Sequence, residues 1–66
     1  MTMKLFQVRI CLHFSYSPSQ LAGYPDIYVM AENEKLARKK ALTYKEENRI
    51  VNGIVFSKEI VEPFLY

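Results

Sequence analysis

Apolar and polar residues alternate near the start of the chain. Five apolar side chains occupy every second position of this segment: Phe6, Val8, Ile10, Leu12 and Phe14. A period of two puts successive side chains on opposite faces of a β-strand, so residues 3–14 predict a strand with one buried face. Because this set is wholly apolar, we expect it to face the core.

Residues 15–26 contain two prolines, a glycine and several serines, a composition typical of a loop. At about a dozen residues, this segment is longer than most hairpin connections. A second, shorter strand is predicted at residues 27–31. Ile27 and Val29 would share one of its faces, and Tyr28 and Met30 the other.

Asn33 precedes a run of residues that contains neither proline nor glycine. This run predicts a helix over residues 34–48, with Asn33 as the N-cap and Glu34 near the positive end of the helix dipole. A helix turns by about 100° per residue, which places four residues on one narrow stripe. This stripe, which we expect to pack on the sheet, consists of Ala37, Ala41, Tyr44 and Asn48.

Residues 54–61 are rich in β-branched and aromatic side chains and predict a third strand. Its alternation is broken at Lys58. Either a β-bulge or a turn at Ser57 and Lys58 would explain the break.

These elements predict an α+β fold of the order strand–strand–helix–strand, a small two-layer ββαβ domain. Its three-stranded sheet would carry one helix packed on one face. The first two strands are expected to be antiparallel; if the second and third are parallel, their crossover should be right-handed. The 66 residues are too few for two cores, so we treat residues 1–66 as a single domain.

Composition narrows the classes of function. The single cysteine, Cys11, excludes an intramolecular disulfide, and the single histidine, His13, excludes a closed zinc site of the usual Cys/His kind. No catalytic motif or phosphate-binding loop is present, so we expect neither an enzyme nor a protein that needs a metal or another cofactor. Without a signal peptide or a long apolar span, the chain is expected to be cytoplasmic and to make no membrane contact.

The first candidate binding surface is the side of the predicted helix opposite Ala37. Cations surround one apolar residue there, and the set is Lys35, Arg38, Lys39, Leu42, Lys45 and Arg49. Such an arc is often no more than a solvated helix face. As a binding site, it would offer Leu42 as an apolar anchor ringed by cations.

Two further surfaces are candidates. A sheet covered by one helix leaves its other face open, and Tyr28 and Met30 would lie there. Either that face stays exposed to solvent, or it is covered by the C-terminal residues 64–66, by a second copy or by a target protein. The third surface is the segment 15–26, whose Tyr16 and Tyr24 lie among serines and a glycine, the mixture found in binding loops.

Residues 28–41 combine a strand that ends in alanine, a capped helix and alanines on the inner side of that helix. In this they resemble very short phage and mobile-element proteins of strand–strand–helix–strand type, including anti-CRISPR and host-takeover inhibitors. The resemblance concerns the fold and transfers no site residues. It implies a small inhibitor or adaptor that binds a bacterial host complex.

We therefore predict a non-catalytic small protein that binds another protein. The first alternative is a nucleic-acid-binding protein that uses the basic helix face; the net charge of +2 permits this and does not argue for it. The second alternative is a homodimeric regulatory or structural protein joined through its sheets.

Overall fold

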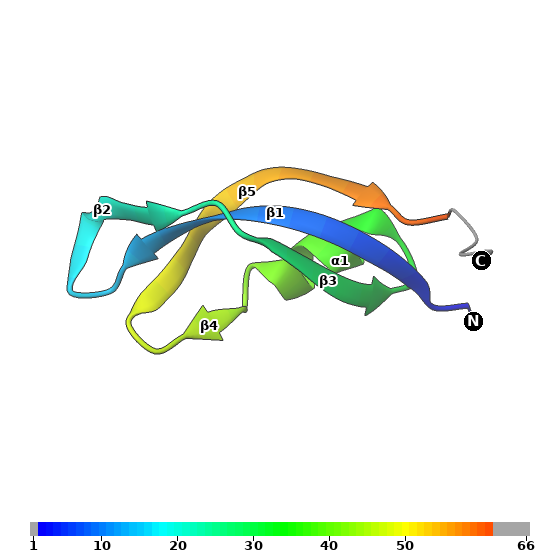
Figure 1. The fold of residues 1–66 in the computed structure, drawn as a ribbon. Coiled ribbons are helices and arrows are strands. Elements are labelled where there is room, and N and C mark those ends of the chain that lie inside the picture. Colours follow the sequence, from blue (N-terminus) through cyan, green and yellow to red (C-terminus); the bar gives the residue numbers. More distant parts are fainter. Residues whose placement is uncertain (1, 62–66) are drawn as a thin grey trace.

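The structure, a computed structural model, describes residues 2–61. Its elements are β1 (Lys4–Phe14), β2 (Ser17–Gly23), β3 (Asp26–Ala31), α1 (Glu34–Ala41), β4 (Lys45–Glu46) and β5 (Arg49–Glu59). Figure 1 shows one twisted sheet with α1 lying against one of its faces. The molecule is elongated, 41 × 27 × 18 Å, because β1 and β5 run side by side over 11 residues each.

The predicted three-stranded α+β sheet is wrong. The sheet has five strands, and 62% of the described residues lie in strands against 13% in the helix, so the fold is mostly β. The two additional strands, β2 and β4, come from the segments predicted as a loop and as the second half of a helix. Each has a specific physical cause.

The predicted loop contains β2, which pairs antiparallel with the last residues of β1. The pairs are Leu12↔Gly23, His13↔Leu21 and Phe14↔Ser17, with two register shifts between them. This pairing is irregular and lies at the edge of the sheet, where proline is tolerated and a buried apolar face is not required. The alternation that identifies a half-buried strand is therefore missing.

The predicted helix ends at Ala41, seven residues earlier than expected. Beyond it the N–H groups of Thr43 and Tyr44 donate to the carbonyls of Lys40 and Ala41, so the last turn tightens. The Thr43 hydroxyl also donates to the Lys40 carbonyl (2.7 Å), as threonine often does at a helix end. The chain then forms β4, which pairs with the start of β5 through Lys45↔Ile50 and Glu46↔Arg49.

β1 is the central strand. β2 and β3 share one of its edges, and β5 occupies the other, all three antiparallel to β1. The expected antiparallel pairing of the first two predicted strands is confirmed by β1 and β3. β3 and β5 consequently run in the same direction with β1 between them, and α1 and β4 connect them.

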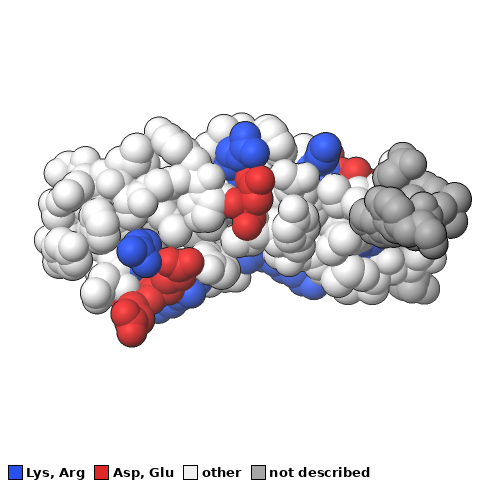
Figure 2. All heavy atoms as spheres, viewed as in Figure 1, with Lys and Arg blue, Asp and Glu red and all other residues white. Residues whose placement is uncertain are grey.

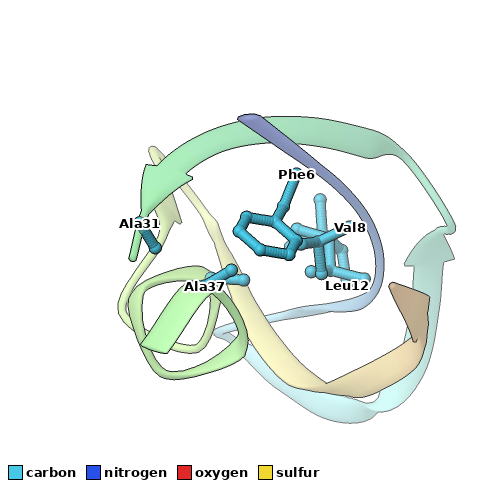
Figure 3. Close-up of a cluster of buried hydrophobic side chains, with 7 residues drawn as sticks. Phe6, Val8, Leu12, Ala31 and Ala37 are labelled. Carbon is cyan, nitrogen blue, oxygen red and sulfur yellow. The ribbon is translucent and has the colours of Figure 1, made fainter. Parts of the chain in front are cut away.

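The core lies between β1 and α1. Its buried side chains are Phe6, Val8, Ile10, Leu12, Ala31, Ala37 and Ala41. Figure 3 shows Phe6 and Val8 pointing from β1 into the space bounded by the curved sheet and by Ala37 of the helix. The predicted core face of the first strand is thus confirmed for all its members except Phe14, which is only half-buried. Of the predicted helical stripe, Ala37 and Ala41 are confirmed, whereas Tyr44 and Asn48 lie beyond the end of the helix.

Two bulges explain the broken alternation in β5. Ile54 pairs with Ile10 and Phe56 pairs with Arg9, so Val55 is an extra residue without an opposite partner. Asn52 is extra in the same way, between the pairs of Val51 and Gly53. A bulge moves the following side chains to the other face. Ile54 therefore packs against the core while Phe56, two residues later, lies on the opposite face.

Candidate binding surfaces

The predicted basic arc is divided between two elements. Because the helix ends at Ala41, Lys45 and Arg49 lie on the β4–β5 hairpin and not on α1. The remaining members, Lys35, Arg38, Lys39 and Leu42, are exposed and line a shallow hollow on the outer side of the helix. The prediction of one continuous arc along a helix is wrong.

Ion pairs reduce the charge available on these elements. Arg38 donates to Glu34 (2.9 Å), and the Ser57 hydroxyl of β5 also donates to that carboxylate. Arg49 donates to Glu46 (3.0 Å), and its guanidinium carbon lies 5.7 Å from the centre of the Phe14 ring. Two of the five predicted cations are therefore already neutralised within the protein.

The tyrosines of the predicted binding loop do not lie together. Tyr16 is in the turn between β1 and β2 and stacks on Phe14, with ring centres 5.2 Å apart. Tyr24 follows β2, at the opposite end of that strand. Both are exposed, but β2 separates them. The structure thus offers two isolated aromatic residues here and not a loop lined by both.

The sheet face that points away from α1 is here called the outer face. It carries the β1 side chains that alternate with the buried apolar side chains of that strand. The strand register places Tyr28 of β3 and Lys58 of β5 on either side of Gln7, and Asp26 and Phe56 on either side of Arg9. Several large apolar side chains on this face are exposed: Leu21, Tyr28, Met30, Ile50 and Phe56. The predicted covering by residues 64–66 lies outside the described residues.

Arg9 is held in place at the centre of the outer face. Its Nε and one terminal nitrogen donate to the two carboxylate oxygens of Asp26, at 2.7 and 3.1 Å. Gln7 donates to the same carboxylate (3.0 Å), and the Arg9 guanidinium lies 4.8 Å above the Phe56 ring centre. The hydrogen bonds between Arg9 and Asp26 lower the pKa of Asp26 and raise the pKa of Arg9. Both groups are therefore charged at neutral pH.

Few charges lie on this side of the molecule. Figure 2, viewed with the strands in front of α1 as in Figure 1, shows mainly uncharged atoms, and most of the blue atoms lie directly against red ones. Among the residues of the β1–β3 pairing that lie on the outer face, the charged ones are Arg9 and Asp26, which pair with each other. The outer face therefore combines exposed apolar and aromatic side chains with the Arg9–Asp26 pair, which is neutral as a whole, and with the exposed Lys58 beside Gln7.

Arg9, Asp26 and Phe56 were not among the predicted site residues. Tyr28 was predicted as a binding residue, and Met30 was predicted to lie on the same face, both from their place opposite the core side of their strand. The alternation of the first strand places Arg9 opposite the core, but the sequence contains no local signal for its contacts with Asp26 and Phe56. Those residues come from two other strands, and the bulge at Val55 reverses the face of Phe56.

His13 has a structural role on the same face. One ring nitrogen, Nδ1, donates to the Pro18 carbonyl, and Nε2 lies 3.4 Å from the Asn52 amide nitrogen. These contacts join β1 to β2 and to the first bulge of β5. Cys11, two residues before His13, is a half-buried free thiol.

A groove runs between the end of β3 and α1. Its walls are formed by Ala31 and Glu32 at the end of β3, by Leu36, Lys39 and Lys40 of α1, and by Met3, and its volume is about 490 Å³. Lys40 also donates to the backbone carbonyl of Met30. This groove lies at the end of β3, next to the Met30 carbonyl that Lys40 reaches.

Comparison with known proteins gives no relative. No family model matches the chain, and neither a curated protein nor a solved structure matches it. No helix among residues 2–61 is long and apolar enough to cross a membrane. Function therefore has to be argued from the surfaces described above.

Proposed function

We propose that this protein is a non-catalytic protein-binding module, and that its outer face contacts the partner. The proposal retains the expected type, a small inhibitor or adaptor of phage or mobile-element kind that acts on a bacterial host complex. The observation that supports it is the exposure of Tyr28, 60% accessible, and of Phe56, 39% accessible, near an arginine that is hydrogen-bonded to Asp26.

The composition of the outer face favours a protein partner. Tyrosine, phenylalanine, methionine and arginine are enriched at protein interfaces, and arginine and tyrosine dominate their energetic centres. Arg9 is already oriented by Asp26 and Phe56, so less side-chain entropy is lost when a partner covers it. A neutral ion pair also avoids repulsion from either sign of charge on the partner.

Nucleic-acid binding by the basic residues has weaker support. The cations are divided between α1 and the β4–β5 hairpin, and Arg38 and Arg49 are paired with glutamates. Fewer free cations leave fewer phosphate contacts, which supply most of the affinity of such proteins. Self-association through the outer face is the third interpretation, and the same experiment separates it from the proposal.

The test is capture of proteins from a nuclease-treated bacterial lysate on the immobilised protein, quantified by mass spectrometry. We expect one host protein to be retained by the wild type and by Tyr24→Glu. Tyr28→Glu should weaken its retention by about thirtyfold, since an interface hot spot contributes about 2 kcal/mol. Tyr24 is the matched control, because it is a similarly exposed tyrosine outside the outer face.

Both variants must show the wild-type circular dichroism spectrum and melting temperature. Equal retention by Tyr28→Glu and the wild type would contradict the proposal. So would capture that occurs only from a lysate not treated with nuclease, which would indicate nucleic acid. Absence of any captured host protein, together with a concentration-dependent mass in sedimentation, would favour the homodimer.

A further inference from the structure

The edge of β3 that faces away from β1 has no strand beside it within residues 2–61. Its ladder with β1 is regular from Lys4↔Ala31 to Arg9↔Asp26, without a bulge. The free edge of β5 carries bulges at Asn52 and Val55, and β2 contains Pro18 and pairs irregularly. Bulges and edge prolines hinder the addition of another strand. β3 is therefore the regular, unprotected edge of this sheet.

The direction of the backbone groups of β3 follows from one hydrogen bond and the register. The N–H of Ile10 donates to the Pro25 carbonyl (3.0 Å), and Val8 lies opposite Ile27. Because hydrogen-bonded pairs alternate along an antiparallel ladder, Ile27 and Val29 bond toward β1. The N–H and C=O groups of Tyr28 and Met30 consequently point away from β1, toward the free edge.

One of these outward groups is already occupied. Lys40 reaches from α1 to donate to the Met30 carbonyl. Within residues 2–61, the N–H and C=O of Tyr28 and the N–H of Met30 have no such partner. They provide two donors and one acceptor along the edge, as an added strand requires.

Side chains on both faces of the sheet at this edge would contact an added strand. Its successive side chains would alternate between the two faces of the sheet. Those on the outer face would meet Tyr28 and Met30, which are exposed. Those on the other face would enter the groove beside α1, where Leu36 and Met3 are apolar and exposed.

The charges of the groove indicate the chemistry of its occupant. Lys39 and Lys40 line it with a single acid, Glu32, so it has an excess of positive charge. An added strand with an apolar residue over Leu36 and an acidic residue near Lys39 would match it. The β3 strand of a second copy of this protein would not match the groove. The inward-facing side chains of that strand, Ile27 and Val29, already pack against the core of their own molecule.

We infer that the free edge of β3 binds an extended segment of the partner protein as an additional β-strand, with alternate side chains in the groove between β3 and α1. The inference rests on the proposed function and states how the partner is held. Main-chain hydrogen bonds supply affinity in this mode of recognition, and the groove supplies specificity.

The probe is a display library of random peptides about ten residues long, long enough to pair along the whole of a strand such as β3. The library is selected on the wild-type protein, and the enriched peptides are synthesised. We expect them to alternate apolar residues with others and to include an acidic position. Selection on Lys39→Glu should replace that acid with a basic residue.

Amide hydrogen exchange measured by NMR locates the bound peptide. In the free protein, the N–H groups of Tyr28 and Met30 should exchange quickly and those of Ile27 and Val29 slowly. A bound peptide should slow exchange at Tyr28 and Met30 by at least about tenfold, because they become hydrogen-bonded. This readout uses the wild-type chain and does not depend on any variant folding.

A proline variant tests the backbone contact directly. Tyr28→Pro removes an N–H that points outward, so it costs no bond to β1, and the extended Ile27 before it suits a proline. We expect peptide affinity to fall about tenfold relative to Tyr28→Thr, which loses the same ring but keeps the N–H.

The inference is overturned if the peptides bind without slowing exchange at Tyr28 and Met30, or if Tyr28→Pro and Tyr28→Thr bind them equally. In either case, loss of lysate capture by Tyr28→Glu would still support contact through the outer face. Failure to select any peptide also overturns it. Slower exchange at these amides on concentrating the protein alone would assign the edge to a second copy instead.

Discussion

Arg9 occupies a polar position in the alternating pattern of the first strand, and its role depends on residues from two other strands. β3 supplies the carboxylate of Asp26, which accepts two hydrogen bonds from it, and β5 supplies the ring of Phe56 beneath it. Neither contact is local in sequence. At the scale of single residues, the candidate site is therefore a product of strand register.

Two carboxylates make the stability of the protein depend on pH. Hydrogen bonds lower the pKa of Asp26, chiefly from Arg9, and of Glu46, from Tyr44 and then Arg49. A carboxyl group with a lowered pKa in the folded state stabilises the fold above its unfolded pKa, which is about 4. That stabilisation is lost as the pH falls through the lower, folded value.

We therefore expect the free energy of unfolding, measured with urea, to decrease as the pH is lowered from about 5 to about 3. Asp26→Asn should reduce this dependence, because it removes one of the two groups. The double variant Arg9→Gln/Asp26→Asn should show the same slope as Asp26→Asn alone. A wild-type pH dependence in Asp26→Asn would contradict the assignment of the ion pair.

At the scale of elements, α1 depends strongly on its cap and its packing. It has only eight residues, and helices this short are not stable in isolation. The Asn33 side chain accepts a hydrogen bond from the Leu36 N–H (2.9 Å), one of the groups that the helix itself cannot satisfy. Ala37 and Ala41 are fully buried and allow the helix to approach the sheet closely.

Asn33→Ala should lower the free energy of unfolding by about 1 kcal/mol, because the capping hydrogen bond is lost. Asn33→Ser keeps a side-chain oxygen that can cap and should remain within about 0.5 kcal/mol of the wild type. Urea titrations followed by circular dichroism measure both values. Equal stability of the alanine and serine variants would show that the cap contributes nothing.

The elements that were not predicted from the sequence were missed for a shared physical reason. β4 has two residues and forms only because the start of β5 is beside it, so no propensity within 45–46 could identify it. β2 is similarly an edge strand without a buried face of its own. In β5, bulges at Asn52 and Val55 interrupt the period of two, and the pattern alone was compatible with a turn as well.

At the scale of the whole molecule, β1 contributes most of one small core. Phe6, Val8, Ile10 and Leu12 are all buried, and they meet α1 on one side of the sheet. No second cluster of buried residues exists within the described chain. One shared core predicts that sheet and helix unfold together in a single transition.

Ile10→Val should lower the free energy of unfolding by about 0.5–1.5 kcal/mol, because it removes a fully buried methylene group. Ile50→Val is the matched control, because Ile50 is exposed on the outer face. This substitution should change the free energy of unfolding by no more than about 0.5 kcal/mol. Tyrosine fluorescence and circular dichroism should report the same midpoint for each variant. Different midpoints from the two probes would indicate more than one folding unit.

Features that repeat at short range could be predicted from the amino-acid sequence without the fold. These are the buried face of the first strand, the cap at Asn33, the alanine stripe, and the exposure of Tyr28 opposite the core. Each depends on the periodicity of one element or on neighbours three or four residues away, and each was predicted correctly. The exposure of the cations on the helix follows from the same periodicity.

The number of strands, the end of the helix and the composition of the outer face depend instead on long-range contacts in the folded protein. Pairing between β1 and β5 joins residues about fifty positions apart, such as Phe6 and Glu59, and two bulges then set which β5 side chains face outward. Whether Arg9 meets Asp26 and Phe56, and whether β3 keeps a free edge beside α1, depends on those long-range pairings. No pattern within a single segment carries that information.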